Sequence, residues 1–143
     1  MNKTIDLARL TGGKMMGELD ITARSWETRY SWGHEATISA NCMEIARSRI
    51  RYYNRTWESY RFQSVIHSAL EGYVHSVTGY NPLKAICKRD TTPMKSAAAE
   101  SRRLDRVAAH DFAVTLYNRL TGIVDGTLTY EDIEKMTAER KVA

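Results

Sequence analysis

The sequence predicts an α+β domain in which an N-terminal antiparallel sheet precedes a group of helices. Apolar and aromatic residues alternate with polar ones between Ile21 and Tyr53, whereas from Phe62 onward they recur every three or four positions. The first spacing is typical of strands and the second of amphipathic helices. Because the two patterns occupy separate parts of the chain, the α+β class is favoured over an alternating α/β arrangement. With 143 residues, the chain is expected to fold as a single domain over residues 1–143.

About three strands are expected within residues 21–57, and the first two form a hairpin. In the first strand, the alternation puts three aromatic residues on one face, together with Thr28: Trp26, Tyr30 and Trp32. The pair Gly33-His34 provides the reversal. The second strand then alternates apolar with hydroxyl residues over residues 36–40.

The third strand covers about residues 44–53 and carries Arg47, Arg49 and Arg51 at alternate positions. Alternate residues of a strand point to the same side of a sheet. The three guanidinium groups are therefore expected on one face. The run Asn54-Arg55-Thr56 ends the strand.

The first long helix is expected over residues 59–78. Eight apolar residues from Phe62 to Val77 follow the spacing of an amphipathic helix, and Gly79 ends it. This helix is expected to cover one face of the sheet. A short helix through residues 4–10 would end at Gly12-Gly13.

A second long helix is expected over residues 93–121, with Thr92 as its N-cap and Pro93 at its first position. Its alanine-rich stretch 97–109 suits close approach by another helix, and we expect a homo-oligomer, a dimer or larger. A short helix over residues 130–139 completes the chain, where Thr129 and Asp132 form a capping arrangement.

Composition narrows the classes of function. The net charge of +4 permits a phosphate-bearing partner without requiring one. No run of residues approaches the ~18 apolar positions of a membrane span, and the N-terminal residues lack the apolar core of a signal peptide. Two cysteines far apart in the sequence indicate free thiols in a reducing compartment. The expected location is the cytoplasm, with no membrane association.

Sequence motifs of catalysis and metal binding are missing. The chain has no Gly-x-Ser-x-Gly elbow, no His-Glu-x-x-His pair and no complete phosphate loop around Gly12-Gly13-Lys14. We therefore expect a protein that is not an enzyme and that holds neither a metal nor a cofactor.

The strongest candidate site is the segment 47–62, in which five arginines and five aromatic residues occupy sixteen positions. A guanidinium group offers a planar fork of donors to phosphate oxygens, and aromatic rings stack on bases. The predicted ligand-binding residues are Arg47, Arg49, Arg51, Tyr53, Asn54, Arg55, Trp57 and Arg61. The alternative is a solvated strand face on which the arginines pair with acidic neighbours.

The run from Arg51 to Val65, which contains Tyr-Asn-Arg-Thr-Trp-Glu, resembles a stretch of small accessory proteins of bacteriophages and related mobile elements. The resemblance covers about fifteen of the 143 residues. It implies a cytosolic anti-defence protein. Such proteins bind an effector nuclease, as anti-CRISPR proteins do, or sequester a cyclic nucleotide signal. Many anti-CRISPR proteins that imitate DNA are acidic, and the basic charge here argues against that mode.

Three functions are therefore open. The first is a non-enzymatic binder of a nucleotide signal or of nucleic acid through the arginine and aromatic surface. The second is a protein inhibitor of a host defence complex such as a CRISPR effector. The third is a small enzyme acting on nucleic acid.

Overall fold

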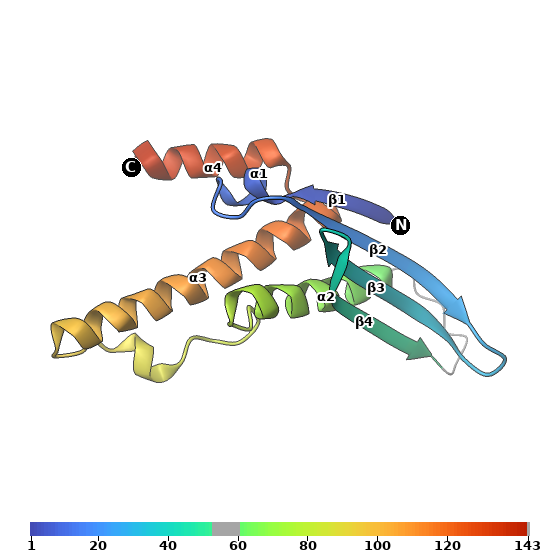
Figure 1. Cartoon of the computed structure of the whole chain (residues 1–143), viewed down its shortest axis with the longest axis horizontal. Coiled ribbons are helices and arrows are strands. Elements are labelled where there is room, and N and C mark those ends of the chain that lie inside the picture. Colours follow the sequence, from blue (N-terminus) through green and yellow to red (C-terminus); the bar gives the residue numbers. More distant parts are fainter. Residues whose placement is uncertain (53–60, 143) are drawn as a thin grey trace.

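The chain folds as a four-stranded antiparallel sheet followed by helices, so the predicted α+β class is confirmed (Figure 1). The structure is a computed structural model that describes residues 1–52 and 61–142. The strands are β1 (Asn2–Asp6), β2 (Glu18–Glu27), β3 (Trp32–Ala40) and β4 (Met43–Tyr52). They lie in the order β1-β2-β3-β4, and each pairs with the next.

The sheet has one strand more than the sequence predicted, because residues 2–6 form β1 instead of the start of a helix. Ile5 is fully buried opposite Leu19 of β2, and this burial against a partner strand favours the extended form. The helix that follows, α1 (Leu7–Thr11), is a short one. Its N-cap is Asp6, whose carboxylate accepts hydrogen bonds from the backbone N–H groups of Ala8 and Arg9.

The reversal between β2 and β3 lies at residues 28–31, and its prediction at Gly33-His34 was wrong. The backbone N–H of Thr28 donates to the Ser31 carbonyl (2.7 Å), and the Ser31 N–H donates to the Thr28 hydroxyl (3.2 Å). Both Gly33 and His34 belong to β3. Because Trp26 pairs with Gly33 and Trp32 with Glu27, the two tryptophans lie on opposite faces of the sheet.

One face of the sheet packs against α2 (Arg61–Thr78), which contacts β3, β4 and β2. The helix buries six of the eight residues of the predicted apolar stripe: Val65, Ile66, Ala69, Leu70, Tyr73 and Val74. The two ends of the stripe differ, because Phe62 is half-buried and Val77 is 43% exposed. Fully buried Ile21 and Ile38 face the helix from neighbouring strands. We call this side the inner face.

The long helix α3 (Ala97–Asp125) begins four residues later than predicted. Ser96, not Thr92, is its N-cap, since the Ser96 hydroxyl accepts a hydrogen bond from the Ala99 N–H. A short 3-10 helix, η1 (Lys88–Thr91), precedes it. The N-terminal half of α3 extends away from the sheet (Figure 1).

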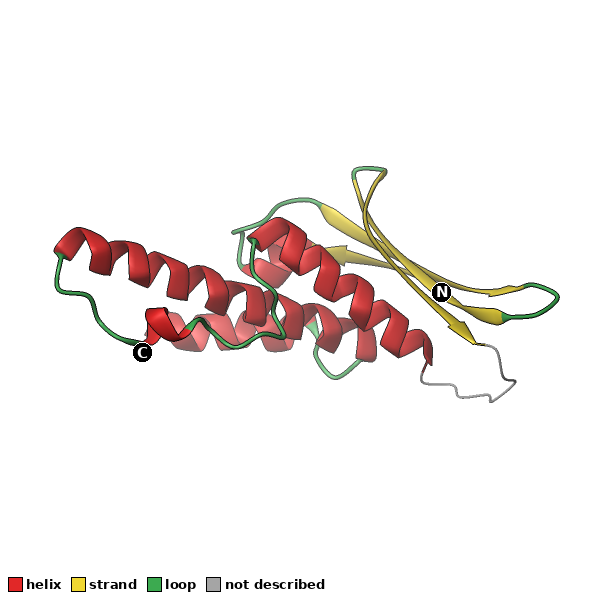
Figure 2. Ribbon diagram, turned by 90° about the horizontal axis from the view of Figure 1, so that it is seen from below, coloured by secondary structure: helices red, strands yellow, loops and turns green. Residues whose placement is uncertain are grey.

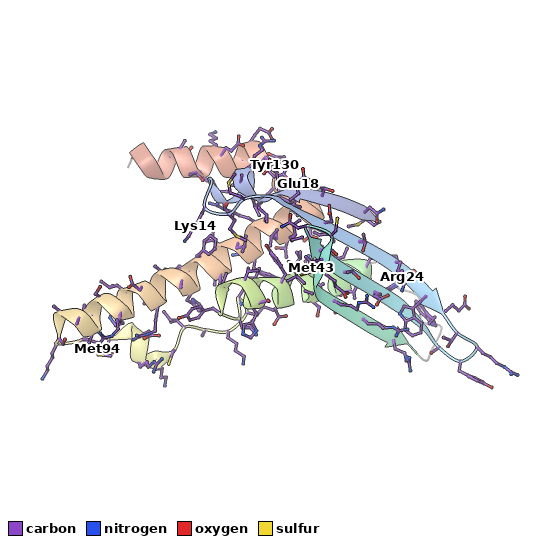
Figure 3. All side chains as sticks on the ribbon, in the orientation of Figure 1. Lys14, Glu18, Arg24, Met43, Met94 and Tyr130 are labelled. Atoms are coloured by element: carbon purple, nitrogen blue, oxygen red, sulfur yellow. The ribbon has the colours of Figure 1, made fainter. Side chains whose placement is uncertain are left out.

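The last helix, α4 (Tyr130–Val142), is joined to the N-terminal segment. The predicted capping arrangement is confirmed, because the backbone N–H groups of Thr129 and Asp132 each donate to the other's side chain. The Tyr130 hydroxyl accepts a hydrogen bond from the Asp6 N–H (2.9 Å), and Arg9 Nε donates to Glu134 (2.7 Å). Figure 3 shows Tyr130 at this junction.

The described helices lie to one side of the sheet and leave its other face uncovered (Figure 2). We call this second side the outer face. A candidate membrane span is not found in any helix of the described residues.

Candidate functional site: the outer face of the sheet

The outer face brings six side chains together across three strands. β2 supplies Arg24 and Trp26, β3 supplies Glu35, and β4 supplies three arginines. The pairing sets Arg24 opposite Glu35 and Glu35 opposite Arg49, while Trp26 and Arg51 flank Gly33. The outer-face cluster is Arg24, Trp26, Glu35, Arg47, Arg49 and Arg51. Figure 3 shows Arg24 projecting from β2.

Glu35 is the buried centre of this cluster, with a side chain only 6% exposed. Its carboxylate accepts hydrogen bonds from Arg24 Nε (3.0 Å) and Arg47 Nη1 (2.8 Å). The hydrogen bond from Arg24 lowers the pKa of Glu35 below its ordinary value, and the charges of Arg47, Arg24 and Arg49 act in the same direction. Burial opposes this shift without cancelling it. Glu35 therefore remains an anion at neutral pH.

Arg47 is neutralised by two carboxylates. Arg47 Nη1 contacts Glu35, and Arg47 Nε lies 2.5 Å from Glu44 Oε1. The hydrogen bond with Glu44 is the main cause of the raised pKa of Arg47. For this residue, the alternative of a solvated strand face with paired charges describes the geometry well.

Arg49 and Arg51 are arranged differently, because both stack over the ring of Trp26. Their Cζ atoms lie 4.0 Å and 5.3 Å from the ring centroid. Within the described residues, neither guanidinium group forms an ion pair with a carboxylate. Cation–π stacking fixes the orientation of these groups without cancelling their charge.

Trp26 can take this position because residue 33 has no side chain. A Cβ atom at Gly33 would lie 2.8 Å from Cζ2 of Trp26 and 1.9 Å from the Ile50 carbonyl oxygen. The indole therefore lies against the backbone of β3. Its buried N–H has no hydrogen-bond partner among the described residues, so stacking holds the ring in place.

Of the eight predicted site residues, the structure brings Arg47, Arg49 and Arg51 together on one face. Tyr53, Asn54, Arg55 and Trp57 lie outside the described residues, and Arg61 begins α2 with an undescribed side chain.

The sequence prediction missed Arg24, Trp26 and Glu35. Their contribution depends on the register between β2 and β3, which the misplaced reversal concealed. Period-two alternation around the correct turn would have placed Trp26 beside the arginines.

Elsewhere in the fold, described residues line two cavities. One of about 410 Å³ is lined by residues of α1, α3 and α4 and by Lys14, which follows α1 (Figure 3). The Lys14 ammonium lies over the Phe112 ring. The other, of about 270 Å³, is lined by residues between His75 and Asp90 and by His110. In the part of the chain that the structure describes, no group of three or more His, Cys, Asp or Glu side chains could hold a metal ion.

Comparison of the chain with protein-family models, with curated proteins and with solved structures finds no match. The interpretation of the outer face therefore depends on its geometry.

Proposed function

We propose that the outer-face cluster binds the phosphate backbone of nucleic acid. The observation that carries this proposal is the stacking of Arg49 and Arg51 on one indole ring, with no ion pair to either guanidinium group from the residues that the structure describes. Two oriented guanidinium forks beside each other offer donors to the oxygens of one phosphate or of neighbouring phosphates. The protein contributes binding and no catalysis.

The charge balance supports an anionic ligand. Arg24, Arg47, Arg49 and Arg51 supply four positive charges, and Glu35 and Glu44 supply two negative ones. These six residues together therefore keep a net charge of about +2, which attracts a polyanion, an attraction that salt screening weakens.

The shape of the site favours a polymer over a small nucleotide. Small-molecule sites are concave and bury most of the ligand. Within the described residues, the outer-face cluster lies on the open surface of the sheet and lines neither of the two cavities described above. An open sheet with arginines about 6.8 Å apart along β4 instead suits contact with successive phosphates of a chain.

The experiment is a fluorescence-anisotropy titration of a labelled oligonucleotide with the double variant Arg49→Ala/Arg51→Ala over a range of salt concentrations. Native protein is expected to bind at low salt, and the double variant is expected to bind more weakly with a salt slope smaller by about 2. The control is Arg102→Ala, which removes one exposed positive charge from α3, away from the outer face. Absence of binding by native protein at low salt would overturn the proposal, as would an equal loss in the control.

A protein partner is the second candidate, because arginine and exposed aromatic residues on a flat face are typical interface anchors. Tyr30, at the tip of the β2–β3 hairpin, is 79% exposed. A host defence protein that co-purifies after nuclease treatment, and that the double variant no longer retains, would favour an inhibitor of the anti-CRISPR kind over a nucleic-acid binder.

The proposed setting is the host cytoplasm, where a phage accessory protein would act against host defence. We also propose a homo-oligomer. In support, Ala97, Ala98 and Ala108 are exposed on α3, and Leu104 of the same helix is 52% exposed. Light scattering should then give a mass of at least twice 16.3 kDa, and a monomer would contradict this.

A further inference from the structure

We propose that Tyr30, at the tip of the β2–β3 hairpin, stacks on an unpaired base and that the ligand of the outer face is single-stranded nucleic acid. This inference rests on the proposed function and adds the class of nucleic acid. It starts from the side chain of Tyr30, which is 79% exposed, the highest value among the exposed large apolar and aromatic side chains of the described chain.

Hydrogen bonds between Thr28 and Ser31 close the turn that carries Tyr30. The Thr28 hydroxyl lies 3.1 Å from the Ser31 carbonyl oxygen and 3.0 Å from the Ser31 hydroxyl. It also accepts a hydrogen bond from the backbone N–H of Ser31. These contacts close the turn on both sides of Arg29 and Tyr30. The tip forms one end of the molecule, beyond the helices (Figure 1).

The Arg29 guanidinium group lies over the Tyr30 ring, with its Cζ 5.4 Å from the ring centroid, and Tyr30 is nevertheless 79% exposed, whereas Trp26 is half-buried. A guanidinium group beside an open aromatic ring is the pairing that single strands require, because one binds phosphate and the other stacks on a base. Arg29 forms no ion pair among the residues that the structure describes. Its charge is therefore available to the ligand.

Trp26 cannot supply the stacking surface. One side of its ring lies against the backbone at Gly33, and the guanidinium groups of Arg49 and Arg51 lie over the ring. The two ends of the hairpin are therefore expected to contact different parts of the ligand. Its base, around Trp26, presents charge to phosphates, and its tip presents an open ring to a base.

A duplex would leave Tyr30 without a partner, since its bases are already stacked and paired, whereas an unpaired strand can place a base on the ring. The phosphate contacts of Arg49 and Arg51 are common to both ligands. Single strands should therefore bind more tightly than a duplex of the same length, and Tyr30 should account for the difference.

The experiment compares an oligothymidylate of about 15 nucleotides with a duplex of equal length, a size within the range of single-strand sites. The variants are Tyr30→Ala, Tyr30→Phe and Tyr30→Leu. Tyr30→Ala is expected to lose roughly 5- to 100-fold in affinity for the single strand with an unchanged salt slope, and to bind the duplex as native protein does. Tyr30→Phe should bind like native protein, and Tyr30→Leu should behave like Tyr30→Ala because it lacks a π face.

A second readout is the fluorescence of a single 2-aminopurine in the oligonucleotide, which stacking quenches. Native protein and Tyr30→Phe should quench it, and Tyr30→Ala should not. If Tyr30→Ala binds the single strand as tightly as native protein, or loses affinity for the duplex equally, the inference is overturned and the proposed function stands. If native protein binds neither ligand at low salt, the proposed function is overturned together with it. The exposure of Tyr30 predicts unchanged thermal unfolding for all three variants.

Discussion

The ring of Trp26 in β2 lies over Gly33 in β3, so close that a Cβ atom at position 33 would be 2.8 Å from it. This contact positions the ring on which the arginines of the proposed site stack. The missing side chain lets the indole lie flat on the sheet, and the flat indole carries the guanidinium groups of Arg49 and Arg51. The placement of the two guanidinium groups therefore depends on the missing side chain at Gly33.

Gly33→Ala is expected to destabilise the protein by about 1–3 kcal/mol, because the added methyl group meets the Ile50 carbonyl oxygen as well as the Trp26 ring. Urea unfolding measures the loss, and oligonucleotide affinity should fall with it as the ring is displaced. The matched control is Gly72→Ala in α2, where the nearest side-chain atom is 3.9 Å away. There the helix should gain about 0.5–1 kcal/mol. Equal stability of the two variants would contradict the packing described.

The β3–β4 turn offers a substitution that should stabilise the protein. Asn41 and Cys42 both have positive φ, at 53° and 63°, a backbone conformation that suits Asn-Gly better than Asn-Cys. Cys42→Gly is expected to raise the free energy of unfolding by about 1 kcal/mol. Cys87→Gly is the control, since φ is −60° at that position and glycine brings no relief there. A loss of stability in Cys42→Gly would refute the turn geometry.

Glu35 should link stability to acid pH. Its folded-state pKa is lowered, so the unfolded chain binds more protons in acid and stability falls as pH drops. The stabilisation from Glu35 is fully present above its pKa in the unfolded chain, about 4.3. It is lost as pH falls through the lower pKa of Glu35 in the folded protein. Glu35→Gln should therefore be less stable than native protein at pH 7, by about 1–3 kcal/mol, with a difference that shrinks below about pH 4.

Glu44→Gln serves as the control for this prediction. In that variant Arg47, the ion-pair partner of Glu44, still forms its ion pair with Glu35. Its effect on stability at pH 7 should be smaller than that of Glu35→Gln. Chemical denaturation of the three proteins between neutral and acid pH makes the comparison. A difference between native protein and Glu35→Gln that grows as pH falls would contradict the ion-pair assignment.

Glu100 provides a second acid-sensitive contact, at the start of α3. Hydrogen bonds from Arg103 and from the Met94 N–H lower the pKa of its carboxyl to about 2. The stabilisation is present above the unfolded value of about 4.3 and disappears as pH falls toward the folded value. An NMR titration of the Glu100 side chain should give this low pKa, and Arg103→Gln should raise it. An ordinary value in native protein would contradict the pairing.

Periodic patterns in the sequence were sufficient to predict α2 and β4. The apolar stripe from Val65 to Val74 follows helical spacing and does not fit the alternation of a strand. The arginines of β4 occupy strictly alternate positions. The prediction of the β2–β3 reversal at Gly33-His34 was wrong for a physical reason. Gly33 looked like a turn residue, whereas its role is to admit a neighbouring ring. The true turn is closed by the Thr28 and Ser31 side chains, a weaker signal.

The candidate site was predictable only in its local part. The spacing of Arg47, Arg49 and Arg51 indicated a common face, and the structure places them there. Which arginines keep their charge depends on Glu35 and Trp26, which come from other strands. Such pairings follow from register, which a single misplaced turn changes for every residue.

The most direct test of the outer-face proposal is an NMR titration of the labelled protein with a single-stranded oligonucleotide at low salt. We expect the resonances of the Trp26 indole N–H and of the Nε–H groups of Arg49 and Arg51 to shift, while that of the Trp32 indole on the inner face stays unchanged. Shifts confined to residues around Lys14 and Phe112, or no shifts at all, would contradict it.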